Sequence, residues 1–325
     1  MVVLMNKLLT IAIPTFNRAE LLDRQLAWLA GAIKGFESEC EILISDNCST
    51  DDTPKVVEKW QLAFENTKFI SKRNQENIGA VKNIASCIQS ATGKYVWTIS
   101  DDDKIFDQTV AYLVKVLKKS ADLALVILNF SKSDAKTGKV FEPRCFDVER
   151  DEITSNGIAL FEQRLEESIG GVGLTTALVY KTKLAQRAIG KWETGLENLA
   201  VQIYWTAFCA SQGTVRITKE NYLECVAGTH YFMENPKLLV ALEYADIPEV
   251  LAKLPEVGFS SSFSRKMVLS RLIHFNWRVL FGALRRWPLI AIKAMLTYLF
   301  CVYQCTVGNI FHPPLNPRQL NLENN

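Results

Sequence analysis

Short apolar runs alternate with helical segments along the first hundred residues, and this alternation constrains the fold more than any other feature. Residues 8–13 form an apolar, partly β-branched run that stops at Pro14, as expected for a strand buried on both faces. The order predicts an α/β fold, a mostly parallel sheet with helices on both faces. Further strands are predicted over residues 41–45, 68–71 and 95–99, and helices over 21–31, 51–64 and 80–91; after the apolar run 123–128 the periodicity is less clear.

The eight cysteines are scattered and form no Cys-x-x-Cys pair, so neither a zinc module nor a redox motif is visible. A reducing compartment is the simplest interpretation. The first seven residues lack the basic and long apolar segments of a signal peptide, and we therefore expect a cytoplasmic protein. No glycine-rich phosphate loop follows a predicted strand, which argues against a dinucleotide-binding Rossmann enzyme and a P-loop NTPase.

Acidic residues follow two predicted strands, at the sheet edge where α/β proteins bind ligands. Asp46 follows the second strand, and Asp101, Asp102 and Asp103 follow the fourth. Three adjacent carboxylates repel one another unless a cation is present, and oxygen ligands suit Mg²⁺ or Mn²⁺ together with a substrate diphosphate. In extended backbone Asp101 and Asp103 would face one site and Asp102 would face away. The alternative is a solvated turn before the helix that begins near Asp107.

Four motifs occur in order: IPTFNR at residues 13–18, ISDNCSTDDT at 44–53, NIG at 77–79 and GKYVWTISDDD at 93–103. Together they resemble the nucleotide-sugar half of family 2 glycosyltransferases of GT-A fold. The closest resemblance is to abequosyltransferase-like enzymes of bacterial O-antigen and surface-polysaccharide synthesis. It covers roughly residues 7 to 130.

The resemblance implies a role for each matching residue. Pro14, Thr15 and Asn17 would line the base and ribose pocket, Asp46 would accept a hydrogen bond from the base, Asp101 would meet the ribose or the metal, and Asp103 would bind the metal. Asn77 and Asp102 are grouped with this nucleotide-sugar site. Asn47 and Cys48 stand where many members have Asp and Gly, so the base stays open: a UDP-sugar is favoured, with CDP- and dTDP-sugars as alternatives.

Three further basic residues are candidates with simpler alternatives. Arg18 could reach the diphosphate or pair with Asp46 or Glu20. Lys82 could approach the pyrophosphate or base, or be a solvated helix charge. His230 could be a further metal or phosphate contact.

An inverting transfer needs a general base beside the acceptor hydroxyl. Family 2 enzymes commonly place this carboxylate in a Glu-Asp pair before a helix, and the counterpart here is Glu197-Asn198. Glu197 is therefore the base candidate and Glu193 the second choice. The simpler role for Glu197 is stabilising a helix N-terminus through the helix dipole.

The C-terminal segment is basic and apolar. Residues 257–322 contain no Asp or Glu but eight Lys and Arg, and Arg271, Arg278 and Arg285 recur every seven residues. The run 289–307 carries one charge, Lys293, and is just long enough to span a bilayer. A basic amphipathic segment lying at a membrane interface is favoured, with a true span or a packed helical pair as alternatives. Nucleic acid is not an expected partner, because the charges are embedded in apolar helices.

We predict a GT-A glycosyltransferase domain over residues 1–256, with a nucleotide-sugar half (1–130) and an acceptor half (131–256), and a membrane-associating tail over 257–325. The predicted activity is metal-dependent, inverting sugar transfer to a saccharide, expected to be lipid-linked, at the inner face of the cytoplasmic membrane. A sugar nucleotidyltransferase is a rival, but it would need a glycine-rich basic loop after the first strand. An inactive membrane-bound scaffold is the other rival, opposed by the intact Asp46, Asp101 and Asp103.

Overall fold

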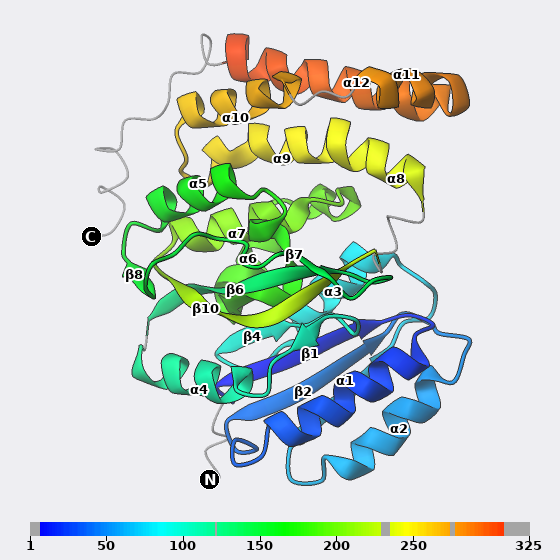
Figure 1. The fold of residues 1–325 in the computed structure, drawn as a ribbon, viewed down its shortest axis with the longest axis vertical. Helices are drawn as coiled ribbons and strands as arrows, with labels where there is room; N and C mark the ends of the chain where they lie inside the picture. The colour runs from blue at the N-terminus through cyan, green and yellow to red at the C-terminus, as the bar shows by residue number, and fades with distance from the viewer. Residues whose placement is uncertain (1–6, 121, 229–234, 274–276, 309–325) are drawn as a thin grey trace. The chain divides into compact units, whose positions relative to one another are not determined.

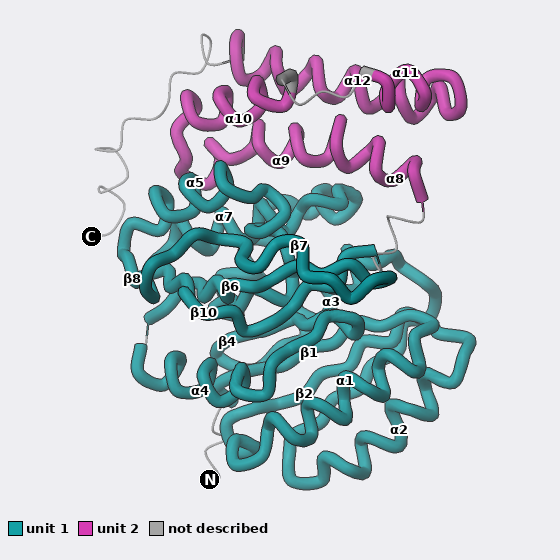
Figure 2. Tube along the Cα trace, viewed as in Figure 1, with its two compact units in different colours: residues 1–234 teal, residues 235–325 magenta. Residues whose placement is uncertain are grey.

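The computed structural model describes residues 7–120, 122–228, 235–273 and 277–308. Their contacts divide the chain into two compact units, residues 1–234 and 235–325 (Figure 2). Sequence analysis placed the division at residue 256, where the acidic residues stop. The packing places it earlier, because the helices between residues 236 and 257 contact the C-terminal helices and belong to unit 2. The two units are described separately.

The first half of the sheet in unit 1 is parallel, as predicted. Strands β3, β2, β1 and β4 are neighbours in that order, and each adjacent pair runs in the same direction (Figure 1). Their carboxyl ends therefore meet at one edge. The four strands are β1 (Leu9–Thr15), β2 (Cys40–Asp46), β3 (Lys68–Arg73) and β4 (Tyr95–Thr98).

The second half makes the sheet mixed. Strand β9 (Leu178–Lys181) is antiparallel to both β4 and β6 (Leu123–Asp134), and β6 pairs in parallel with β10 (Thr214–Ala227). Consequently β6 and β10 run in the direction of β1, and their carboxyl ends lie at the same edge. Short antiparallel strands complete the sheet: β5 (Lys104–Ile105) and β8 (Glu152–Thr154) on β10, and β7 (Val140–Glu142) on β6.

Helices cover both faces of the sheet, as the alternation predicts (Figure 1). On one face α1 (Ala19–Ala32) packs against α2 (Thr53–Ala63) and α4 (Thr109–Lys119). On the other face α3 (Ala80–Ser90) contacts α6 (Thr182–Lys191), which contacts α7 (Val201–Ser211), and α7 contacts α5 (Gly157–Glu167). Three 3₁₀ turns connect these elements: η1 (Gly171–Gly173), η2 (Thr175–Ala177) and η3 (Glu193–Glu197).

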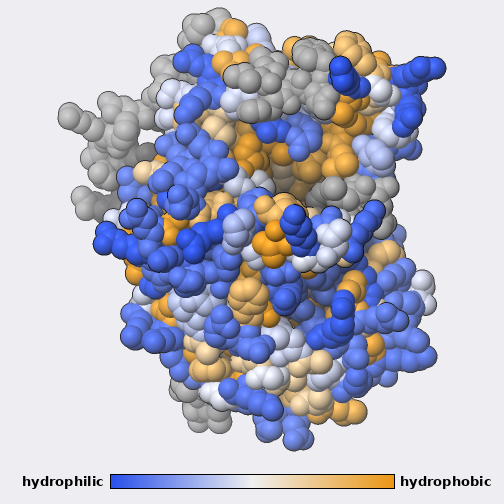
Figure 3. All heavy atoms as spheres, in the orientation of Figure 1, coloured by the Kyte–Doolittle hydropathy of each residue, from blue (hydrophilic) through white to orange (hydrophobic). Residues whose placement is uncertain are grey.

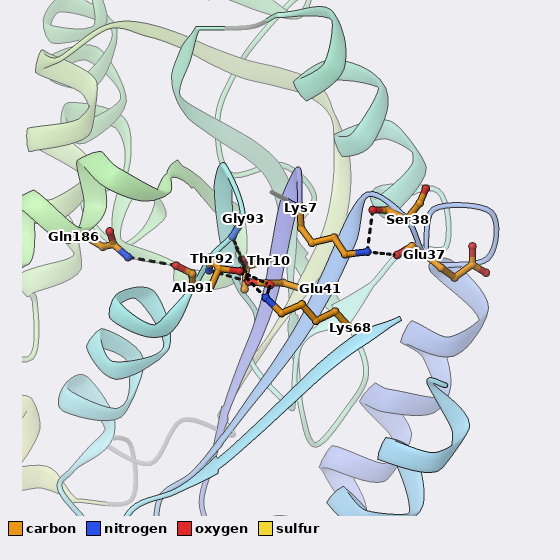
Figure 4. Close-up of polar contacts among 10 residues, drawn as sticks. All are labelled: Lys7, Thr10, Glu37, Ser38, Glu41, Lys68, Ala91, Thr92, Gly93 and Gln186. Carbon is orange, nitrogen blue, oxygen red and sulfur yellow. Dashed lines mark hydrogen bonds and ion pairs between the residues drawn. The ribbon is translucent and has the colours of Figure 1, made fainter. Parts of the chain in front are cut away.

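A fully buried carboxylate, Glu41, accepts hydrogen bonds from several segments at the amino-terminal edge of the sheet (Figure 4). Its oxygens accept hydrogen bonds from the Thr10 hydroxyl (2.6 Å), Lys68 Nζ (2.7 Å) and the Thr92 amide (2.8 Å) and hydroxyl (2.6 Å), and Gly93 N lies 3.2 Å away. Burial alone would raise the pKa of Glu41, but the hydrogen bonds from Lys68, Thr10 and Thr92 outweigh it and lower the pKa to about 2. The cluster ties the turn before β4 to β1, β2 and β3.

Unit 2 is helical. A core of Val240, Tyr244, Leu280, Ala283, Ala291 and Ala294 joins four of its segments. The order is α8 (Pro236–Ala241), the π-helical turn η4 (Leu242–Asp246), α9 (Ile247–Lys253), the 3₁₀ turn η5 (Leu254–Val257), α10 (Ser261–Ile273), α11 (Trp277–Arg286), α12 (Pro288–Tyr303) and the π-helical turn η6 (Gln304–Gly308).

Candidate active site

The loops after β1 and β4 meet at the carboxyl edge of the sheet, because these two strands are neighbours. The Thr15 hydroxyl donates to Asp101 Oδ2 (3.0 Å). One Arg18 guanidinium nitrogen lies 2.8 Å from Asp101 Oδ1 and 2.9 Å from Asp102 Oδ2. Burial raises the pKa of Asp101 more than the Arg18 charge lowers it. One cation therefore already compensates two of the three carboxylates.

Asp103 is the least compensated acid of the site. It is 3% exposed, and its Oδ1 atom is buried without a hydrogen-bond partner. Burial raises the pKa of Asp103 to about 7, against the opposing hydrogen bond with Thr176. Such an acceptor favours a proton or a cation.

Two expectations about these acids are wrong. Arg18 pairs with Asp101 and Asp102 instead of Asp46 or Glu20, because the loop that carries it lies beside the end of β4. The predicted alternation also fails: β4 ends at Thr98 and residues 101–103 form bends, so Asp101 and Asp102 reach the same guanidinium. Among the described residues no group of three His, Cys, Asp or Glu is arranged to hold a metal. His230 lies outside the described residues.

Asp46 ends β2, where it is 4% exposed. Its Oδ1 accepts from the Ser49 amide (2.9 Å), and its Oδ2 lies 2.7 Å from an Arg73 nitrogen. Arg73 also donates to the Ser49 carbonyl (2.6 Å), which closes the loop. Arg73 thus takes the place beside Asp46 that had been one alternative for Arg18.

The predicted pocket residues of the β1 loop are held against the β2 loop. Pro14 is half-buried in β1, where it is aligned with Ser45. Asn17 has a left-handed backbone (φ 52°), and its amide donates to Ser49 Oγ (2.9 Å) while its Oδ1 accepts from the Thr50 amide (2.7 Å). Asn17 itself is exposed, so its side chain is available at the loop surface.

A chain of side-chain amides links this loop to the start of α3. Asn47, which is 2% exposed, donates to Asn77 Oδ1 (2.7 Å), and its own Oδ1 accepts from Asn74 Nδ2 (2.9 Å) and the Ile78 amide (3.0 Å). Asn74 also donates to Asn83 Oδ1 (3.1 Å). Asn47 therefore fixes the Asn77-Ile78-Gly79 turn. Sequence analysis marked Asn47 only as a departure from the family pattern.

Lys82 and Glu197 form an ion pair, with Lys82 Nζ 2.6 Å from Glu197 Oε1. Lys82 is in the first turn of α3, and Glu197 is the last residue of η3, three residues before the N-cap of α7. The Glu197 side chain is 77% exposed, so its carboxylate is accessible to a substrate. Glu193 opens the same 3₁₀ turn. The pair brings the base candidate to the carboxyl edge of the sheet.

Comparisons with known proteins now identify the domain that carries the loops after β1, β2 and β4. Residues 10–166 match the sequence profile of Glycosyl transferase family 2. The chain carries a family 2 glycosyltransferase domain. The chain is 35% identical to an abequosyltransferase of Salmonella typhimurium over 118 residues. The aligned residues make up 36% of this chain and 35% of that protein. The chain is 30% identical to the GalNAc(5)-diNAcBac-PP-undecaprenol β-1,3-glucosyltransferase of Campylobacter jejuni over 33% of each protein. The matches span about a third of these relatives.

Solved structures show that the glycosyltransferase domain has the GT-A fold. TarS residues 1–349 of Staphylococcus aureus in complex with UDP-GlcNAc superpose with a TM-score of 0.64 at 16% identity, covering 92% of this chain and 81% of that one. A mannosyltransferase of Pyrobaculum calidifontis, solved with GDP-Man and Mn²⁺, has a TM-score of 0.54 at 16% identity, covering 93% and 87%. Nucleotide-sugar binding and a divalent metal are thus found in structures of this fold.

Sequence analysis missed two residues that shape the glycosyltransferase site. Arg73 ends β3 and neutralises Asp46; its only signal was a basic residue two positions after a predicted strand. Thr176 is fully buried, and its hydroxyl accepts from the Ser100 amide (3.0 Å) while its carbonyl accepts from Trp97 Nε1 (2.8 Å). It lies 73 residues beyond Asp103 in a segment without clear periodicity, so no local pattern marked it.

Proposed function

We propose that this protein transfers one sugar from a nucleoside diphosphate sugar to a hydroxyl group of a saccharide acceptor. The observation that carries the proposal is the buried acidic loop, where Asp103 has an unpartnered oxygen at the carboxyl edge of a family 2 domain. A buried carboxylate oxygen without a hydrogen-bond donor favours the binding of a cation. A UDP-sugar is the favoured donor, and CDP- and dTDP-sugars are the alternatives.

The donor nucleoside is proposed to bind between the β1 and β2 loops. Thr15 and Asn17 belong to one loop and Asp46 to the other, and hydrogen bonds between the loops hold them in place. A carboxylate oxygen can accept more than one hydrogen bond, so Asp46 can accept from a base N–H while keeping Arg73 and Ser49. Lys82 in the first turn of α3 supports a diphosphate on this side, because the helix dipole there also favours anions.

The residues present fit a Mg²⁺ or Mn²⁺ ion. Asp103 offers a buried oxygen without a partner, and its raised pKa shows that the surroundings do not supply enough positive charge for the ionised form. Asp103 and Asp101 would hold the metal, while Asp102 shares Arg18 with Asp101 and also accepts a hydrogen bond from the Ser100 hydroxyl. When bound, the ion would offset negative charge on the departing diphosphate.

Glu197 is proposed to take the proton of the acceptor hydroxyl. The acceptor oxygen forms a bond to the anomeric carbon, the bond from that carbon to the diphosphate oxygen breaks, and the proton passes to the Glu197 carboxylate. Attack opposite the leaving group inverts the anomeric configuration. Glu197 is exposed and beside Lys82, which supports the role; Glu193 is the alternative base.

The acceptor is proposed to be a lipid-linked saccharide of a surface polysaccharide, handled at the inner face of the cytoplasmic membrane. Two relatives support this step, since one is named an abequosyltransferase and another acts on an undecaprenol-linked saccharide by its name. Residues 1–130 would bind the donor, and residues 131–234 of unit 1 would contribute the acceptor side.

The test is a panel of UDP-, CDP-, dTDP- and GDP-sugars offered to the purified full-length protein with Mg²⁺, Mn²⁺ or EDTA. We expect one donor class to raise the melting temperature in a metal-dependent manner and to transfer its sugar to a lipid-linked saccharide. Release of inorganic pyrophosphate from a sugar phosphate and a nucleoside triphosphate would instead show a nucleotidyltransferase. No thermal shift with any donor at millimolar metal would contradict the proposal.

A further inference from the structure

One face of α12 is apolar and exposed. Large apolar side chains recur along it at helical spacing, and they lie within an arc of about 100° when successive residues are turned by 100°. Their exposed fractions run from 47% to 83%. The face consists of Leu289, Ile292, Leu296, Leu299, Phe300 and Tyr303. Large apolar side chains that are exposed together along one helix face indicate an interaction site.

The opposite face of α12 is packed into unit 2. Ala291, Ala294, Tyr298, Cys301 and Cys305 on this side of the helix and η6 are buried. The Tyr298 hydroxyl donates to the Val268 carbonyl of α10 (2.9 Å). The residues from Pro288 to Val307 are long and apolar enough to cross a membrane by length and composition, with a mean hydropathy of 1.5. A crossing would break this packing, because the same helix cannot be surrounded by lipid and hold α8, α9 and α10.

Basic residues accompany the apolar face. Lys293 is exposed at its edge, and Arg278, Arg285 and Arg286 are exposed on α11. Phe281 is 63% exposed among these arginines. Residues 257–322 contain no acidic residue. Figure 3 shows apolar and strongly hydrophilic residues side by side over the α11 and α12 segment of unit 2.

We propose that the exposed face of α12 binds the surface of an anionic phospholipid bilayer, with the helix axis in the membrane plane and the α11 arginines at the headgroups. Apolar side chains enter the boundary of the acyl chains while basic ones stay with the phosphates. A second copy is a poorer occupant. A two-fold contact would place the same patch against itself, and the arginines of both copies would repel one another.

The benefit of membrane binding rests on the proposed function, since an enzyme bound at the membrane surface encounters a lipid-linked acceptor by diffusion within that surface. Binding itself does not depend on catalysis, so the two can fail separately. Each basic residue near an anionic surface contributes about a fivefold factor to partitioning. Screening by salt weakens this part and leaves the apolar part intact.

The test measures partitioning of the full-length protein onto vesicles with 30% phosphatidylglycerol in phosphatidylcholine, against pure phosphatidylcholine. Leu296→Glu changes the apolar face, and Leu62→Glu is its control at an 80% exposed site on α2. Arg285→Glu with Arg286→Glu changes the charge, and Lys115→Glu with Lys119→Glu on exposed α4 positions is the matched control. Transfer to a soluble saccharide acceptor is measured for every variant.

We expect Leu296→Glu to lower partitioning by roughly 30-fold and the double arginine variant by at least about 25-fold, with the controls within about fivefold of the parent. Activity on the soluble acceptor should not change. Equal partitioning of Leu296→Glu and Leu62→Glu would overturn the inference, as would no partitioning of the parent at low salt. A dimer that Leu296→Glu dissociates would show that a second copy covers the face. Binding without any transfer would instead contradict the proposed function alone.

Discussion

Replacing Asp103 by asparagine should stabilise the metal-free protein at neutral and alkaline pH while abolishing sugar transfer. The pKa of Asp103 is raised from 3.8 to about 7 by burial. Between these two values the unfolded chain loses the proton and the folded chain keeps it. The contribution of this group to stability is therefore present below pH 4 and is lost progressively as the pH rises through 7.

The magnitude follows from the two pKa values. The raised pKa of Asp103 costs the folded state about 4 kcal/mol at pH 8, where the group is ionised, and about 1.7 kcal/mol at pH 5, where it keeps its proton, at 1.36 kcal/mol per pKa unit. Asparagine removes this cost but buries an amide group near an Oδ1 position without a partner, which costs about 1–3 kcal/mol. We expect a net gain of about 1–3 kcal/mol at pH 8. The cost of burying the amide is the same at both pH values. The difference in unfolding free energy between the parent and the variant should therefore change by about 2.5 kcal/mol from pH 5 to pH 8.

Urea unfolding at pH 5 and pH 8, with EDTA and with Mn²⁺, measures these quantities. Asp107→Asn, at an exposed position, is the control for the loss of one carboxylate. Saturating Mn²⁺ should stabilise the parent selectively, because a ligand that binds only the folded state adds to its stability. A parent-to-variant difference that does not change between pH 5 and pH 8 would refute the burial argument. Equal stabilisation of both proteins by Mn²⁺ would refute the metal assignment.

Three further substitutions test other parts of the molecule. Glu41→Gln should lose about 3 kcal/mol of unfolding free energy at pH 7, since the pKa of Glu41 is lowered from 4.5 to about 2; the loss should vanish as the pH falls from 4.5 to 2, which urea unfolding would show. Glu197→Gln should lower kcat by more than about 100-fold and leave donor affinity within a few fold, and a kcat close to that of the parent would exclude Glu197 as the base. Asp46→Ala should chiefly raise the donor KM, because a base contact is made in ground and transition states alike; a changed kcat with an unchanged KM would contradict the base contact.

The first four strands and their helices could be predicted from the sequence because the signals for them are local. The run at residues 8–13 and the polar stop after it correspond to β1 (Leu9–Thr15), and the run at 41–45 corresponds to β2 (Cys40–Asp46). The family resemblance confirmed by the match over residues 10–166 rests on motifs at the ends of these strands. The mixed second half was not predicted, because the antiparallel position of β9 between β4 and β6 depends on contacts between distant segments.

The partner of Arg18 shows why the site was harder to predict than the strands. Polar loops follow β1, β2 and β4, and β1 lies between the other two, so Arg18 could reach either loop. Arg73 decides the outcome by occupying the Asp46 carboxylate, which leaves Asp101 and Asp102 for Arg18. No local sequence pattern could predict this choice of partners, since Arg73 and Asp46 are 27 positions apart and Arg18 and Asp101 are 83 apart.

Two buried acids at opposite edges of the sheet show how the groups around a carboxylate distinguish a structural acid from a functional one. Glu41 is fully buried with a pKa of about 2, and Asp103 is 3% exposed with a pKa of about 7. Burial raises the pKa of both acids, so the difference comes from the hydrogen-bond donors around Glu41 and from the neighbouring carboxylates Asp102 and Asp101 beside Asp103. Glu41 is surrounded by donors from three segments, whereas one oxygen of Asp103 has none. A proton or a cation would compensate the unpartnered oxygen of Asp103, and for this reason we propose that the cation and the diphosphate bind there.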